Sequence, residues 1–340
     1  MSPVDPYRES GVDIEKGNRL VDWLKDGTAR EDPTCGQVIS GIGGFAGLFE
    51  PNLKKYSQPV LVSSTDGVGT KLLLGLQYHK LEGLGTDLVA MCVNDLYTVG
   101  ARPLFFLDYF ATGLLDEEQF KAVLSGINHG LSLCSTAMLG GETAELPGLY
   151  KKGHFDLAGF VVGVVDKDKK LGPHLVQKDD VLIGIASQGF HANGYSLIRK
   201  WLQDTPPDES LIDHLLMPTK IYSFIPELIE TFEGQIHAAA HITGGGLKEN
   251  LGRVLPRNLQ AQVKSNAIQT PDWMRKLILN HVQNLGQVEK VFNMGIGMIL
   301  AVSKDSASAI LAELHRAEVT ASIIGNMVSR QTSNDNVIYI

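Results

Sequence analysis

A carboxylate, several hydroxyls, two glycines and a cation follow one another within the nine residues Ser63-Ser-Thr-Asp-Gly-Val-Gly-Thr-Lys71. Asp66 could bind Mg²⁺, which prefers oxygen ligands that it shares with phosphates. Lys71 and free backbone N–H groups could meet phosphate oxygens. The alternative is a strand-to-loop turn in which Asp66 bonds to its own backbone. The residue types therefore indicate either a metal–phosphate site or an ordinary turn.

Three further acids, Asp95, Asp108 and Glu142, lie near the ends of predicted elements in the same half of the chain. Asp108 lies in an apolar run, where a buried carboxylate costs on the order of several kcal/mol unless it is paired or bound to a metal. We therefore expect Asp66, Asp95, Asp108 and Glu142 to converge on a divalent cation.

Polar residues also interrupt the apolar helix predicted over Gly85–Val99. Asp87, Asn94 and Thr98 share one face of that helix, because they are spaced by seven and four residues. A polar stripe that faces solvent is the simplest interpretation.

Two segments of the second half, Ser187–Ser196 and His241–Gly246, lie between predicted strands and predicted helices. Their small and polar residues could hold a phosphate at a helix N-terminus, where unpaired N–H groups favour an anion. Capped helices with ordinary turn histidines are the alternative. A zinc site at His237 and His241 is not expected, since a strand does not bring them to one face with a third ligand.

The glycine-rich segment Gly41–Gly47 superficially matches a dinucleotide-binding fingerprint. Pro51 and Pro59 interrupt the helix that such a fingerprint requires, so we exclude a Rossmann domain. A Walker A phosphate loop is also absent from the sequence. The segment is either a flexible lid or a surface loop.

Strand and helix patterns alternate in both halves of the chain, with Asp116 as the expected N-cap of a helix. The charged stretch 166–170, followed by Gly172-Pro173, breaks both periodicities. We therefore predict two α/β domains with mixed sheets, over residues 1–170 and 171–340. Strands are expected at 59–65, 103–110, 155–165, 181–186, 236–240, 260–263, 298–302 and 322–328.

The composition excludes several classes of protein. With 44% hydrophobic and 20% charged residues, a folded core is expected. A formal net charge of −8 does not favour binding to nucleic acid or to an anionic membrane. Apolar runs fall short of the roughly 20 residues that span a bilayer, and no signal peptide is visible. Cys35, Cys92 and Cys134 form no CxxC pair, which favours free thiols and a cytoplasmic location.

Together these segments resemble the phosphoribosylformylglycinamidine cyclo-ligase family of purine biosynthesis, also called aminoimidazole ribonucleotide synthetases. The resemblance runs nearly end to end, in the family's order and spacing. Its motifs are Gly11–Ile14, Gly41–Phe45, Thr65–Lys71, Met91–Leu96, Pro103–Gly113, Gly140–Glu145, His191–Ser196, Pro218–Tyr222, His241–Gly246 and Phe292–Met298.

The resemblance implies an ATP-dependent, Mg²⁺-requiring ring closure of formylglycinamidine ribonucleotide to 5-aminoimidazole ribonucleotide, with release of ADP and phosphate. ATP would phosphorylate the formyl amide oxygen, and the amidine nitrogen would then attack the resulting iminophosphate. The implied fold is a two-domain α/β subunit with mixed sheets. Its N-terminal sheets would pair into a barrel in a homodimer.

The resemblance also assigns roles to residues of the matching motifs. The catalytic residues would be Asp66, Lys71 and His191, and the metal ligands Asp66, Asp95, Asp108 and Glu142. ATP and its phosphates would contact Lys25, Gly43, Gly44, Thr65, Gly67, Gly69, Thr70, Asn94, Gly140 and Gly141. The substrate would contact Asn193, Gly194, His241, Thr243, Gly244, Gly245 and Gly246. Ala192 departs from the family, which usually has serine there, so a hydrogen bond from this position to the substrate is in doubt.

The nearest alternatives are selenophosphate synthetase and thiamine-monophosphate kinase, which use carboxylates and glycine-rich segments in the same way. The surroundings of Cys35 do not resemble the reactive-cysteine segment of a selenophosphate synthetase. A third alternative is a nucleotide-binding protein without catalytic activity. The presence of Asp66, Lys71, Asp95 and Glu142 argues against it.

Overall fold

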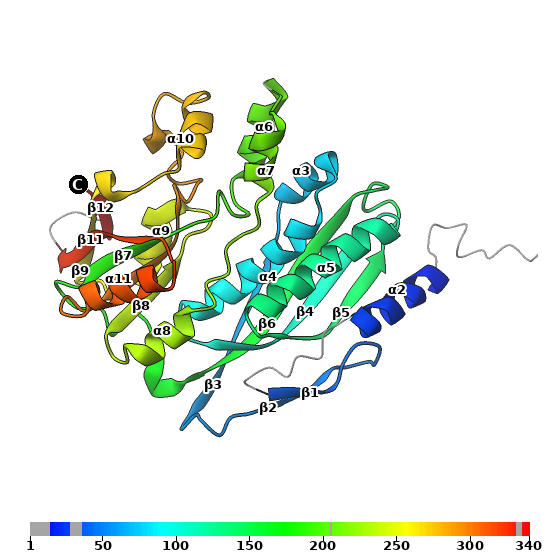
Figure 1. Ribbon diagram of the computed structural model, residues 1–340, viewed down its shortest axis with the longest axis horizontal. Coiled ribbons are helices and arrows are strands. Elements are labelled where there is room, and N and C mark those ends of the chain that lie inside the picture. Colours follow the sequence, from blue (N-terminus) through cyan, green and yellow to red (C-terminus); the bar gives the residue numbers. More distant parts are fainter. Residues whose placement is uncertain (1–13, 28–35, 205, 331–334) are drawn as a thin grey trace, which may run out of the picture. The chain divides into compact units, whose positions relative to one another are not determined.

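The structure is a computed structural model that describes residues 14–27, 36–204, 206–330 and 335–340. Its contacts divide the chain into two units (Figure 1). The first unit comprises residues up to Val93 together with Arg102–Val164, and the second comprises Asn94–Ala101 and Val165–Ile340. The predicted domain boundary near residue 170 stays a prediction.

The first unit is built on a four-stranded mixed sheet in the order β3 (Pro59–Gly67), β6 (Phe155–Asp166), β4 (Arg102–Thr112) and β5 (Ala137–Glu145). β4 runs antiparallel to β6 and parallel to β5. Buried and exposed residues alternate along most of β6, so one face of the sheet is covered and the other is open. The prediction of mixed sheets is confirmed.

Helices α4 (Glu82–Tyr97) and α5 (Glu117–Leu133) lie along the sheet in Figure 1. The Asp116 carboxylate caps α5 by accepting a hydrogen bond from the Gln119 N–H at 3.0 Å, as predicted. The two helices approach closely through glycines. A Cβ on Gly126 would lie 1.8 Å from the Glu82 carbonyl oxygen, so any side chain there would push the helices apart.

The remaining elements of the first unit are peripheral to this sheet. Strands β1 (Gly36–Ser40) and β2 (Leu48–Pro51) form an antiparallel hairpin, and the Phe49 ring lies 5.4 Å from the Phe105 ring of β4. Helix α2 (Ile14–Gly27) packs against α5, and α3 (Lys71–Tyr78) follows the loop after β3.

The second unit is built on a six-stranded sheet that is antiparallel except at one edge. Its order is β12 (Val337–Tyr339), β9 (Leu259–Val263), β11 (Ala321–Ser329), β7 (Val181–Ala186), β10 (Ile296–Val302) and β8 (Ile236–His241), with β12 parallel to β9. Its helices are α6 (Tyr195–Asp204), α7 (Glu209–Leu216), α8 (Ile225–Thr231), α9 (Gly246–Arg253), α10 (Asp272–Leu279) and α11 (Ala307–Arg316), with short 3₁₀ turns at Lys167–Lys169, Ser265–Ala267 and Leu285–Gln287.

Helix α9 supplies part of the core of this unit. Leu247 and Leu251 pack with apolar residues of the sheet, such as Ile299 and Met327. The helix ends at Arg253, ahead of Pro256, whose ring and missing N–H do not allow a helix to continue. The strands predicted in both halves are all present, with ends that differ by one or two residues.

The charged stretch 166–170 at the predicted domain boundary contains regular structure. β6 continues to Asp166, and a 3₁₀ turn covers Lys167–Lys169. The Leu171 N–H then donates to the Val99 carbonyl at 3.1 Å, which ties the end of this segment to residues 94–101 within the second unit.

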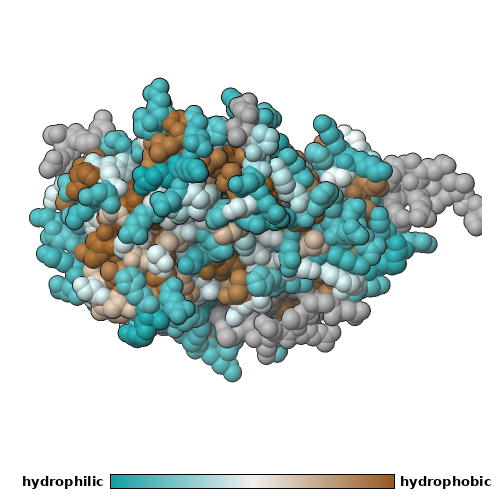
Figure 2. Space-filling view, turned by 45° about the horizontal axis from the view of Figure 1, so that its top comes forward, coloured by the Kyte–Doolittle hydropathy of each residue, from teal (hydrophilic) through white to brown (hydrophobic). Residues whose placement is uncertain are grey.

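On the face drawn in Figure 2, hydrophilic residues predominate and hydrophobic residues form separate patches. Among the helices of the described residues, none has both the length and the apolar character needed to cross a membrane.

Candidate active site

The loop after β3 has the turn geometry that sequence analysis offered as an alternative to a metal site. The Gly67 N–H donates to Asp66 Oδ1 at 2.7 Å, and Thr65 Oγ1 donates to the Gly159 carbonyl at 2.8 Å. Gly69 has a φ of 62°, which favours glycine, and Thr70 stands at the N-cap of α3. A carboxylate offers about four acceptor positions, so this turn is compatible with a further ligand at Asp66.

Lys71 does not point into an open site. It is fully buried, and its Nζ lies 2.8 and 2.9 Å from the two carboxylate oxygens of Asp87. Burial lowers the pKa of Lys71, while the Asp87 carboxylate acts in the opposite direction. In this structure the lysine joins α3 to α4, and its role as a phosphate ligand stays a prediction.

The interpretation of Asp87 and Asn94 as a stripe facing solvent is wrong, because both side chains are fully buried. A helical period shows which residues share a face, and the covering of that face depends on tertiary packing. Both residues instead have partners that are distant in sequence.

Asp108 is buried, as its apolar surroundings in the sequence suggested. A Cβ on Gly141 of the neighbouring strand would lie 1.9 Å from Asp108 Oδ1, so the glycine makes room for the carboxylate. Burial, together with the nearby Glu142 carboxylate and against an opposing backbone hydrogen bond, raises the pKa of Asp108 to about 7. A cation nearby would favour the ionised form.

The predicted metal ligands do not form one preassembled cluster. Within the described residues, no group of three or more His, Cys, Asp or Glu side chains could hold a metal ion. Asp66, Asp108 and the exposed Glu142 belong to the first unit, and Asp95 belongs to the second. Mg²⁺ often takes only one or two carboxylates and shares substrate phosphates. Asp108 and Glu142, on the paired strands β4 and β5, therefore fit such a shared site, and the metal assignment stays a prediction.

The remaining residues predicted to contact ATP lie in three places. Gly43 and Gly44 are exposed in the loop between β1 and β2, and Gly43 has a φ of 101°. Gly140 lies in β5, beside Gly141. Lys25 lies in α2, but its side chain is outside the described residues.

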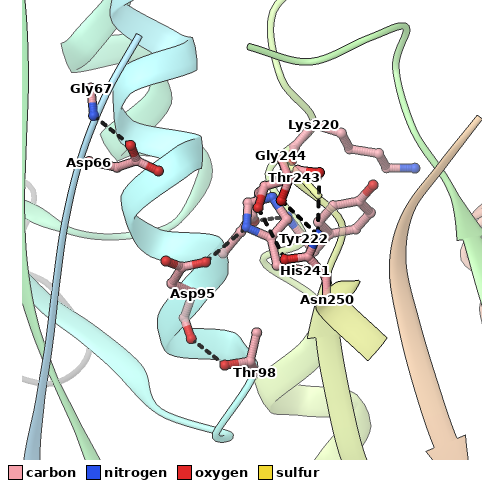
Figure 3. Close-up of polar contacts among 11 residues, drawn as sticks. Asp66, Gly67, Asp95, Thr98, Lys220, Tyr222, His241, Thr243, Gly244 and Asn250 are labelled. Carbon is pink, nitrogen blue, oxygen red and sulfur yellow. Dashed lines mark hydrogen bonds and ion pairs between the residues drawn. The ribbon is translucent and has the colours of Figure 1, made fainter. Parts of the chain in front are cut away.

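The second unit pairs Asp95 with His241 (Figure 3). His241 is the last residue of β8, and its Nδ1 lies 2.9 Å from Asp95 Oδ1. Its Nε2 is buried and has no hydrogen-bond partner in the described part of the chain. A carboxylate on Nδ1 places the N–H there in the neutral ring and leaves the lone pair on Nε2. The pair therefore presents an unused acceptor.

Asn250 holds the turn that follows His241. Its Nδ2 lies 3.3, 3.1 and 2.8 Å from the carbonyl oxygens of Thr243, Gly244 and Gly246 (Figure 3). Gly245 and Gly246 have φ values of 95° and 67°. Sequence analysis missed Asn250, although its position one helical turn after Gly246 was a usable signal.

The loop before α6 contains His191, Asn193 and Gly194. His191 is buried at a φ of 61°, and its Nε2 accepts from the Gln188 N–H at 3.1 Å, which gives it a structural contact within the loop. Asn193 Nδ2 is buried and has no hydrogen-bond partner among the described residues. Its Oδ1 is 3.5 Å from the point where a Gly244 Cβ would stand, so Asn193 borders the turn held by Asn250.

Asn94, which was predicted to contact ATP, binds the backbone of residues 220–222. Its Nδ2 donates to the Lys220 carbonyl at 2.9 Å, and its Oδ1 accepts from the Tyr222 N–H at 3.0 Å. Both hydrogen-bonding groups of the amide thus hold residues 220–222, and a contact with ATP stays a prediction. Lys220 and Tyr222 were quoted only as part of a motif, and no residue-level signal identified them.

Family comparisons cover both halves of the chain. Residues 52–165 match the family described as AIR synthase related protein, N-terminal domain, and residues 177–337 match its C-terminal domain. A phosphoribosylformylglycinamidine cyclo-ligase from Nitrosococcus oceani is 46% identical, covering 98% of this chain and 94% of the relative. One from Coxiella burnetii is 48% identical, covering 97% and 95%.

A solved structure shares the fold at much lower identity. The thiamine-monophosphate kinase from Stenotrophomonas maltophilia has a TM-score of 0.66 and 20% identity, with 94% of this chain and 95% of that chain covered. This likeness concerns the two-domain arrangement of mixed sheets and carries no information about the substrate.

Proposed function

This chain belongs to the phosphoribosylformylglycinamidine cyclo-ligase family, and from that premise we propose that the Asp95–His241 pair handles the proton released in ring closure. The chain catalyses ATP-dependent closure of formylglycinamidine ribonucleotide to 5-aminoimidazole ribonucleotide, with release of ADP and phosphate, in purine biosynthesis.

The chemistry requires a leaving group and a proton acceptor. An amide oxygen is a poor leaving group. Transfer of the terminal phosphoryl group of ATP to the formyl oxygen turns it into a good one, because phosphate can then depart. The amidine nitrogen then attacks the formyl carbon, the C–N bond forms, and the C–O bond breaks with departure of phosphate. The attacking nitrogen must lose its N–H proton in this sequence, and a positioned base accelerates such a transfer.

The observation that carries this assignment is the buried, unused Nε2 of His241. The Asp95 carboxylate at 2.9 Å keeps the proton on Nδ1 and so keeps the lone pair of Nε2 available. Asn193 Nδ2, a buried donor beside the same turn, suits the substrate's amide oxygen. Asp95 is thus proposed as the residue that orients His241, in place of its predicted role as a metal ligand.

The family uses ATP, and we assign its Mg²⁺ to Asp108 and Glu142, which lie on the paired strands β4 and β5 of the first unit, with phosphate oxygens as further ligands. The role of Asp66 as a metal ligand stays a prediction. Mg²⁺ would neutralise charge on the phosphate oxygens. The support for this assignment is the raised pKa of Asp108, because a carboxylate in such surroundings gains from a neighbouring cation.

We also propose a homodimer formed through the open face of the first unit's sheet. Tyr109 and Phe160 are each 40% exposed there, and Leu107 lies opposite Phe160 in the ladder. Contiguous apolar residues on a sheet face are typical of an association surface. A cytoplasmic location accords with the two buried free thiols, Cys92 and Cys134.

Phe160→Glu is expected to convert the dimer to a monomer, because a charge would be buried in the pairing face. Light scattering during gel filtration measures the mass. Leu149→Glu replaces a leucine that is 74% exposed outside the sheet, and it should leave the mass unchanged. A wild-type monomer would contradict the proposed dimer.

The function itself is tested by following ADP and 5-aminoimidazole ribonucleotide together, with Mg²⁺, ATP and formylglycinamidine ribonucleotide as reactants. Both products should appear one for one, and neither should appear without the ribonucleotide. The cyclo-ligase assignment is wrong if the rate of ADP release does not depend on formylglycinamidine ribonucleotide but increases with selenide or thiamine monophosphate.

A further inference from the structure

We propose that Lys220 binds a phosphate group of one of the reactants. The inference rests on the proposed function, because that function supplies two phosphate-bearing ligands: the ribonucleotide, with its 5′-phosphate, and ATP. Lys220 lies in the irregular segment between α7 and α8 and has no role in the turns described above.

The backbone that carries Lys220 is held rigidly within the second unit. The amide of Asn94 pairs with the Lys220 carbonyl and the Tyr222 N–H, as a neighbouring strand would. Tyr222 is fully buried, and its hydroxyl donates to the Ala186 carbonyl at 3.1 Å. Thr219 on the other side is also buried. The lysine side chain therefore starts from a fixed point, which suits a binding residue.

The ammonium group of Lys220 is half-buried and has no acidic partner among the described residues. Its Nζ lies 5.8 Å from the centroid of the Tyr222 ring, and in Figure 3 the side chain extends away from the Asp95–His241 pair. Burial alone lowers the pKa of Lys220. By contrast, the fully buried Lys71 has the Asp87 carboxylate as its partner.

A partly desolvated cation without a counter-ion is unfavourable by itself and becomes favourable when an anion binds. The ring of Tyr222 offers only a weak contact at this distance. Lysine binds phosphate as a compact point charge, and each reactant carries phosphate. A phosphate dianion is accordingly the ligand chemistry that the site fits.

Lys220→Met keeps most of the side-chain volume and removes the charge, and calorimetric titration measures its effect on binding. Two ligands are used separately: formylglycinamidine ribonucleotide, and a non-hydrolysable ATP analogue with Mg²⁺. The affinity for one of them should fall roughly 10- to 150-fold, as expected for loss of a charged hydrogen bond. The affected ligand identifies which phosphate Lys220 binds.

Three comparisons sharpen this test. The ribonucleoside that lacks the 5′-phosphate should bind wild type and Lys220→Met with equal affinity. Lys220→Arg should keep most of the affinity, because it keeps the charge. Lys264→Met, at an exposed lysine, should leave both affinities unchanged. A melting temperature close to that of the wild type excludes misfolding of the Lys220 variants.

Unchanged affinity for both ligands in Lys220→Met would overturn the proposal, as would a loss equally large for the ribonucleoside without phosphate. Failure of the proposed function is a separate outcome. It would appear as absence of the ribonucleotide product in the wild-type assay, whereas the binding data concern the lysine alone.

Discussion

Replacing His241 with glutamine is expected to lower kcat by roughly 10²- to 10⁴-fold, the usual contribution of a positioned general base. The amide of glutamine is not basic, so the attacking nitrogen would have no group to accept its proton. KM for ATP should change little, because Nε2 is assigned to the substrate's nitrogen. Steady-state kinetics with coupled detection of ADP and product provide the measurement.

Asp95→Asn tests the orienting role separately. An asparagine oxygen can still accept from Nδ1, but the charge that fixes the tautomer is lost. We expect a smaller fall in kcat than for His241→Gln, and a change in the ¹⁵N chemical shifts of His241 from a protonated Nδ1 towards a mixture of tautomers. A residue that only supports the fold would not move these shifts.

His237 provides a matched control on the same strand. Its Nδ1 lies 2.7 Å from Asp180 Oδ2, so it is a second buried imidazole–carboxylate pair. His237→Gln should lower the free energy of unfolding and leave kcat unchanged at a temperature where the variant is folded. The assignment of His241 fails if His241→Gln retains wild-type kcat, or if both histidine variants lose activity equally.

Replacing Asp108 with asparagine is expected to stabilise the ligand-free protein above neutral pH. The pKa of Asp108 is about 7 in the fold, against 3.8 for an aspartate exposed to water. Because the folded value is the higher one, its contribution to stability is fully present below pH 3.8 and is lost as the pH rises through about 7. The gap between the two values corresponds to on the order of 4 kcal/mol.

Urea unfolding of wild type and Asp108→Asn at pH 5, 6, 7 and 8 measures this effect. The difference in unfolding free energy should grow across the series and level off above pH 7. Asp156→Asn, an exposed carboxylate on the neighbouring strand β6, should show no such trend. A pH-independent difference at Asp108 would show that the carboxylate is not held in its neutral form.

Mg²⁺ and an ATP analogue extend the same experiment to the proposed metal site. If Asp108 is a ligand, they should raise the melting temperature of the wild type more than that of Asp108→Asn, since binding to the folded state stabilises it. Equal stabilisation of both proteins would remove Asp108 from the Mg²⁺ site.

Much of the fold was predictable from local patterns. The strand patterns and the Asp116 cap are local features, so they survive in the structure. The ends of elements were less predictable: the charged stretch 166–170, which breaks both periodicities in the sequence, contains the end of β6 and a 3₁₀ turn.

The partners of the site residues were not predictable in this way. The polar spacing of Asp87 and Asn94 looked like an exposed stripe, yet Asp87 meets a lysine 16 positions away, and Asn94 meets residues 126 and 128 positions away. Such partners depend on tertiary packing, which a single helical period does not contain. Family motifs identified His241 and Asn193, but only the structure shows that His241 Nε2 and Asn193 Nδ2 lack hydrogen-bond partners among the described residues.

The double contact of Asn94 with residues 220–222 separates the folding of this segment from its choice of ligand. Only an amide of this length offers both a donor and an acceptor there, so the identity of residue 94 is restricted by the backbone that it holds. The side chain of residue 220 makes no hydrogen bond or ion pair that this backbone needs within the described residues. Position 220 can therefore vary in evolution or in design, changing the preferred ligand at little expense to folding.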